Sequence, residues 1–90
     1  MSNIKSFKIT AKKMTLKNMI ELYHSCQNVS HQIYIYSKKS MGKIKDIIDF
    51  ETYRMINPDS EYVIVIEGKE AKHIVNRFEK LWGNNALLKG

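Results

Sequence analysis

The chain has 90 residues, of which 43% are hydrophobic and 27% charged, with one cysteine and a formal net charge of +6. This length supports one hydrophobic core, and the composition is typical of a globular domain rather than a disordered chain. The single cysteine excludes an intramolecular disulfide and a Cys₂ zinc half-site. No run of about 18 apolar residues occurs, and lysines alternate with apolar residues over 1–13. We therefore expect no membrane insertion, no secretory signal and a cytoplasmic protein.

The positive charge is concentrated in the first half of the chain. Up to Lys45 there are nine lysines and one acidic residue, Glu21, whereas from Asp46 onward there are six basic and eight acidic residues. A basic half attracts nucleic acid, phosphate or an acidic protein face. A solvated, lysine-rich surface would have the same composition. The alternation of aromatic residues with arginine that is typical of nucleic-acid readers is missing, which makes nucleic acid the less favoured partner.

The first predicted elements are a strand and a helix. Apolar and polar residues alternate over 6–11, which predicts a strand buried on one face. In the helix that follows, Thr15 is the predicted N-cap and Asn28 the left-handed residue that closes it. The apolar stripe of this helix has helical spacing and comprises Leu16, Met19, Ile20, Tyr23 and Cys26.

A hairpin and a second helix are predicted next. Residues 32–37 form a strand with two isoleucines on one face and two tyrosines on the other, and 41–44 form a short returning strand. Asp46 then caps a second helix, and 57–60 (Asn-Pro-Asp-Ser) form a turn. The apolar positions of this helix are Ile47, Phe50, Tyr53 and Ile56.

The last elements are a central strand and a third helix. Residues 62–66 are apolar on both faces, as a strand with neighbours on both sides should be. The third helix is predicted to end at 83–85, giving a single domain over 1–83 and a loose tail over 84–90. Its apolar positions are Ala71, Ile74, Val75, Phe78, Leu81 and Trp82. The order β-α-β-β-α-β-α, with one apolar face per helix, predicts an α+β fold in which helices cover one side of a single sheet.

Four segments, in this order and spacing, resemble the HPr family, the small phosphocarriers of the bacterial sugar phosphotransferase system. They are ITA (9–11), QIYI (32–35), IKDIIDF (44–50) and VIVIEGKEA (63–71), and the resemblance extends over 4–82. It implies an open-faced sandwich, with a four-stranded antiparallel sheet of order 1-4-2-3 covered on one face by three helices.

The resemblance also shows where the phosphorylation sites are degenerate. Thr15 stands where the family has its phosphoryl-accepting histidine, and of the neighbouring family motif only the charge at Lys17 remains. Threonine lacks the nucleophilic nitrogen, so we do not expect phosphorelay by the family mechanism. Asp46 stands where Gram-positive members carry a regulatory serine. It would be a partial, permanent mimic of phosphoserine, or simply a good N-cap.

A docking surface follows from the same resemblance. In the family, the two positions after the regulatory serine are exposed apolar residues that dock partners; here they are Ile47 and Ile48. Together with Leu16 and Ile20 they would form an apolar patch, unless both isoleucines belong to the core. The rim of the patch would consist of Lys12, Lys13, Lys17 and Lys45.

No catalytic set is recognisable in the sequence. The histidines His24, His31 and His73 lack metal-ligand spacing, and Cys26 completes an apolar stripe as a buried thiol would. We therefore expect no metal, no cofactor and no enzyme, but weak binding of phosphate or sulfate at the start of the first helix. The leading hypothesis is a non-catalytic regulatory module that docks a phosphotransferase-system enzyme or a transcriptional regulator through the surface around Thr15, Asp46 and Ile48. A small basic nucleic-acid-binding protein and a divergent phosphocarrier are the alternatives.

Overall fold

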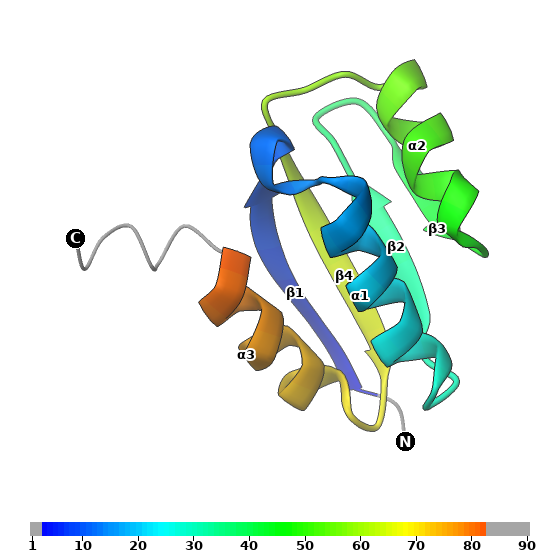
Figure 1. The fold of residues 1–90 in the computed structure, drawn as a ribbon, viewed down its shortest axis with the longest axis vertical. Helices are drawn as coiled ribbons and strands as arrows, with labels where there is room; N and C mark the ends of the chain where they lie inside the picture. Colours follow the sequence, from blue (N-terminus) through cyan, green and yellow to red (C-terminus); the bar gives the residue numbers. More distant parts are fainter. Residues whose placement is uncertain (1–2, 83–90) are drawn as a thin grey trace.

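A computed structural model describes residues 3–82 and confirms the predicted order of elements (Figure 1). The predicted helix end at 83–85 and the tail over 84–90 lie outside the described residues. The elements are β1 (Asn3–Thr10), the 3₁₀ turn η1 (Ala11–Lys13), α1 (Leu16–Gln27), β2 (Gln32–Tyr36), β3 (Met41–Ile44), α2 (Ile47–Ile56), β4 (Glu61–Gly68) and α3 (Ala71–Trp82).

The four strands form one antiparallel sheet in the order β1-β4-β2-β3. In its register, Ile64 of β4 pairs with Phe7 of β1 on one side and with Ile35 of β2 on the other. Figure 1 shows α1 in front of the sheet, with α3 beside β1 and α2 beside β3. The fold is therefore α+β with three helices, in the strand order that the phosphocarrier resemblance implies.

The core lies between the helices and one face of this sheet. Period-two alternation turns every second strand residue inward, and the cross-strand register aligns these residues into rows. The buried strand residues are Phe7, Ile9, Ile33, Ile35, Ile44, Tyr62, Ile64 and Ile66. The helices and the turn before α1 contribute Met14, Met19, Leu22, Cys26, Phe50, Tyr53, Ala71, Ile74, Val75, Phe78 and Trp82. Within residues 3–82, no helix covers the opposite face of the sheet (Figure 1).

The structure corrects the predicted stripe of α1. Leu16 and Ile20 are exposed, whereas Leu22, which the prediction left out, is fully buried. The apolar residues of α1, Leu22 included, form a stripe that is wider than the contact with the sheet, so periodicity alone does not define which of them are buried. Contacts with the sheet select Met19, Leu22 and Cys26, spaced three and four residues apart.

Three further predictions were wrong in detail. Ala11 belongs to η1 rather than to the first strand, because the strand ends where its pairing with β4 ends, at Thr10. The backbone of Asn28 has the right-handed helical conformation, and Ser30 instead has the positive φ, of 57°. The reason is that a further turn separates the end of α1 from the chain reversal. Ile56 and Leu81 are exposed, since each lies beyond the buried face of its helix.

Candidate functional site: the face of α1 and α2

The start of α1 has the predicted cap. Oγ1 of Thr15 accepts a hydrogen bond of 3.1 Å from the amide of Asn18, and Nδ2 of Asn18 donates to the carbonyl of Lys13 at 2.7 Å. Within residues 3–82 the amides of Leu16 and Lys17 donate to no acceptor. Two free N–H groups therefore point out of the helix start, where the helix dipole favours negative charge.

The start of α2 is capped more completely. Oδ1 of Asp46 accepts from the amide of Ile48 at 3.0 Å, and Oδ2 of Asp49 accepts from the amides of Lys45 and Asp46 at 2.7 and 3.2 Å. This reciprocal capping box confirms Asp46 as the N-cap. The carboxylate of Asp46 is therefore bound to its own helix.

The two helices lie side by side in opposite directions (Figure 1). Nη1 of Arg54, late in α2, donates to the carbonyl of Met14 before α1, and the hydroxyl of Tyr23, late in α1, donates to the carbonyl of Lys45 before α2. The caps Thr15 and Asp46 therefore lie apart along the helix pair, by roughly 12 Å at about 1.5 Å per residue. The two caps were predicted to share one surface, and they lie towards opposite ends of the helix pair.

The sequence left open whether Ile47 and Ile48 are exposed or belong to the core, and the structure gives a different answer for each. Ile47 is half-buried and packs against the core, whereas 67% of Ile48 is exposed. Met55 is seven residues after Ile48, on the same face of α2, and is 79% exposed. Met55 was not among the predicted residues, although its spacing of seven from Ile48 could have indicated it. We call the exposed apolar set Leu16, Ile20, Ile48 and Met55 the α1–α2 face.

The charged residues around this face are mainly basic. Lys12, Lys13 and Lys17 are exposed near the start of α1, and Lys45 is exposed before α2. None of these four ammonium groups has a carboxylate partner in the part of the chain that the structure describes. Within α2, Glu51 and Arg54 form an ion pair of 3.2 Å. Exposed apolar side chains of α1 and α2 therefore occur together with four lysines and the Glu51–Arg54 ion pair, and many protein interfaces combine apolar and charged residues in this way.

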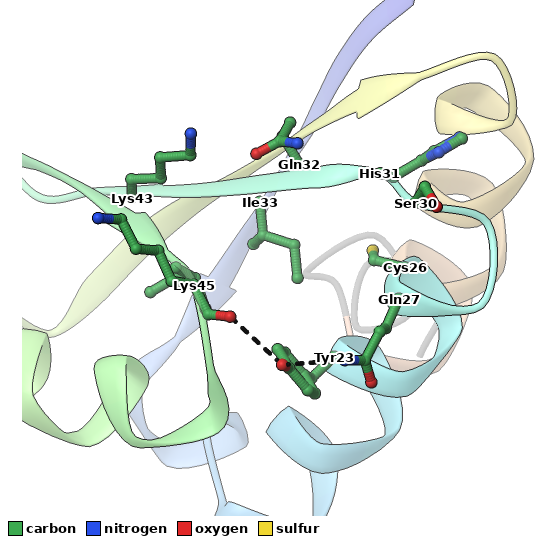
Figure 2. Close-up of a pocket in the computed structure, with 10 residues that line it drawn as sticks. Tyr23, Cys26, Gln27, Ser30, His31, Gln32, Ile33, Lys43 and Lys45 are labelled. Atoms are coloured by element: carbon green, nitrogen blue, oxygen red, sulfur yellow. Dashed lines mark hydrogen bonds between the residues drawn. The ribbon is translucent and has the colours of Figure 1, made fainter.

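A pocket of about 400 Å³ lies between the end of α1 and the strands β2 and β3 (Figure 2). The hydroxyl of Tyr23 accepts from Nε2 of Gln27 at 3.3 Å and closes one side of the pocket. Cys26 is buried in its wall, and burial raises the pKa of the thiol from 9.0 to about 12. The thiol is therefore neutral near pH 7 and is no activated nucleophile. In Figure 2 the side chains of Lys43 and Lys45 extend away from the pocket.

His31 also lines this pocket, but its ring is already engaged. Nδ1 lies 2.9 Å from the carbonyl of Val29, and the amide of Glu70 donates to Nε2 at 2.7 Å. A carbonyl can only accept, so the ring carries its proton on Nδ1 and offers the Nε2 lone pair to Glu70. His31 thus joins the start of β2 to the start of α3. Among residues 3–82, no three His, Cys, Asp or Glu side chains are grouped so as to hold a metal ion, and no helix is long and apolar enough to cross a membrane.

The fold and this face define the protein as a small α+β domain with one exposed two-helix surface. The chain is 49% identical over 81 residues to the uncharacterized protein YwjC of Bacillus subtilis (strain 168), and the match covers 90% of each chain. It belongs to the same family as YwjC. No protein-family model matches the sequence, and no solved structure matches the chain. The phosphocarrier resemblance therefore rests on the sequence segments and the strand order alone.

Proposed function

We propose that the protein is a non-catalytic, HPr-like binding module of the cytoplasm that docks a protein partner through the α1–α2 face. The observation that carries this proposal is the exposure of Ile48 and Leu16, at 67% and 54%, on two adjacent helices beside unpaired lysines. An apolar centre drives association, and a charged rim orients the partner.

The charges indicate the chemistry of the partner. Lys12, Lys13 and Lys17 lie near the free amides at the start of α1, so a carboxylate of the partner is favoured there by ammonium groups, N–H groups and the helix dipole together. The partner is thus a protein with an apolar contact flanked by acidic residues. By the phosphocarrier resemblance, it is an enzyme of the phosphotransferase system or a transcriptional regulator.

Phosphorelay is not part of this proposal. Thr15 has no nucleophilic nitrogen, and its hydroxyl is the acceptor for the amide of Asn18. Incubation with the phosphoenolpyruvate-dependent kinase of the phosphotransferase system should add no phosphoryl group, as measured by intact mass. An acid-labile phosphate on any residue would instead establish a divergent phosphocarrier.

Docking is tested by pull-down from the native cell extract with wild type and two variants in parallel. Ile48→Asp should lose a specific partner, because it places a charge in the apolar centre. Leu81→Asp is the matched control, since Leu81 is 55% exposed on α3, away from the α1–α2 face. The captured protein should also bind less tightly to Lys17→Gln. A partner that binds wild type and Ile48→Asp equally, or is lost equally with Leu81→Asp, excludes docking through this face.

A further inference from the structure

The face of the sheet that the helices leave uncovered carries two tyrosines between lysines. The register aligns Met41, Tyr36, Val63 and Lys8 in one row across the four strands. The next row consists of Lys43, Tyr34, Val65 and Ser6. Seven of the eight are next to a buried residue of their strand, and Met41 precedes Lys43 by two positions on the same face, so all eight side chains lie on the open face. We call these two rows the tyrosine platform.

The two rings are adjacent on β2. Tyr34 and Tyr36 are two residues apart, which corresponds to about 6.6 Å along a strand. The hydroxyl of Tyr34 donates to Oε1 of Glu67 on β4 at 3.2 Å, so this ring extends from β2 across the sheet and is held there. Tyr36 is 42% exposed. On the open face, the inner strand β2 thus presents the anchored ring of Tyr34 and the exposed ring of Tyr36.

Cations lie on either side of these rings. Lys43 is directly opposite Tyr34 on β3, and Lys8 follows Tyr36 and Val63 across the sheet on β1. The side chain of Lys43 extends outward from β3 (Figure 2). In the described part of the chain none of these lysines has a carboxylate partner. The acidic residues of this face lie on β4. A negatively charged group of a ligand is therefore favoured along the β3 edge, beside the lysines.

We propose that the tyrosine platform binds single-stranded nucleic acid, with bases stacked on Tyr34 and Tyr36 and phosphates beside Lys43 at the β3 edge. Aromatic rings stack on any unpaired base, and lysines that track the backbone release counterions on binding. Bases of a duplex are already stacked on each other and cannot reach the rings. The aromatic–cation pattern that the linear sequence lacks is created by the pairing of β2 with β3 and of β4 with β1.

The test measures fluorescence anisotropy of a labelled oligothymidylate of about 12 nucleotides, within the site sizes of small single-strand binders. A duplex of the same length is the competitor. Wild type should bind the single strand and prefer it to the duplex. Tyr36→Ala should weaken binding roughly 5- to 150-fold, the range for loss of one stacked base. Tyr36→Phe keeps the ring and should bind like wild type, whereas Tyr36→Leu keeps bulk without a ring and should bind as weakly as Tyr36→Ala.

Charge is tested by a matched pair of variants. Lys43→Gln should reduce the slope of log affinity against log salt concentration by about 0.7, the value for one phosphate contact on a single strand. Lys72→Gln changes the net charge equally from an exposed position on α3 and should leave the slope unchanged. Ile48→Asp should bind the oligonucleotide like wild type, which separates this surface from the α1–α2 face. Thermal unfolding confirms that each variant is folded.

Three outcomes overturn the proposal. One is the absence of saturable binding at low salt. Another is equal weakening by Lys43→Gln and Lys72→Gln, which shows general attraction to a basic protein. The third is unchanged oligonucleotide binding in Tyr36→Ala, together with concentration-dependent self-association of wild type that Tyr36→Ala abolishes in sedimentation. In that case the open face is an interface between two copies of the chain.

Discussion

At the scale of single residues, the two helix caps can be tested by substitution. Thr15→Ala and Asp46→Ala should each lower the free energy of unfolding by about 1 kcal/mol, because each leaves a helix amide without its acceptor. Thr15→Ser and Asp46→Asn retain the acceptor oxygen and are the controls. Denaturant unfolding measures all four variants. Equal stability of the alanine variants and wild type would contradict the capping geometry.

Cys26 gives the molecule a dependence of stability on alkaline pH. Burial raises the pKa of its thiol from 9.0 to about 12. The unfolded chain therefore releases this proton at lower pH than the folded protein. The stability contributed by the neutral thiol is complete below pH 9.0 and is lost progressively as the pH rises toward 12.

Comparison of wild type with Cys26→Ala isolates this effect. The free energy of unfolding of wild type should fall more steeply with pH above 9.0. Iodoacetamide should alkylate the native thiol at neutral pH far more slowly than the unfolded one. Fast native alkylation would show that the side chain is accessible and its thiolate populated.

At the scale of elements, His31 links β2 to α3. A Cβ atom added at Gly68 would collide with the His31 ring, which hydrogen bonds to Val29 and Glu70 hold in place. His31→Ala should cost about 1 kcal/mol, because the amide of Glu70 loses its acceptor. Gly68→Ala should be more destabilising in wild type than in the His31→Ala background, where the ring is absent.

A double-mutant cycle measures this coupling, and any backbone cost of alanine at Gly68 cancels in it. Additive effects of the two substitutions would show that the ring does not obstruct position 68. The same cycle tests whether His31 acts as a structural residue, since a purely surface histidine would give no coupling.

The start of α1 is the second element with a testable property. Titration with inorganic phosphate should shift the amide signals of residues 16–18, because two of these amides are free and Lys17 is adjacent. Lys17→Ala should weaken the shifts. Shifts spread evenly over all lysines would indicate ordinary counterion binding and no anion site at this helix start.

At the scale of the whole molecule, the two proposed surfaces lie on opposite layers of the fold. The α1–α2 face belongs to the helix layer, and the tyrosine platform is the far side of the sheet. The double variant Ile48→Asp, Tyr36→Ala should therefore lose partner binding and oligonucleotide binding to the same extent as the respective single variants. Fluorescence anisotropy and pull-down with wild type, the two single variants and the double variant measure the two losses. Loss of both activities in either single variant would indicate one shared surface or general unfolding.

Local patterns in the sequence determined the elements and their order. Strand alternation, helical spacing and the caps at Thr15 and Asp46 depend on residues within a few positions of each other, and the structure confirms them. The sequence also supported one sheet covered on one side, since each helix has one apolar face. The strand order agrees with that implied by the phosphocarrier resemblance.

Only the tertiary structure decided which apolar and charged side chains share a surface. The burial of Leu22 in place of Leu16 and the separation of Ile47 from Ile48 depend on packing against residues far away in the chain. The distance between Thr15 and Asp46 depends on the antiparallel arrangement of α1 and α2. The lysine–tyrosine rows exist only because antiparallel pairing aligns residues from different strands, and no local pattern contains that register.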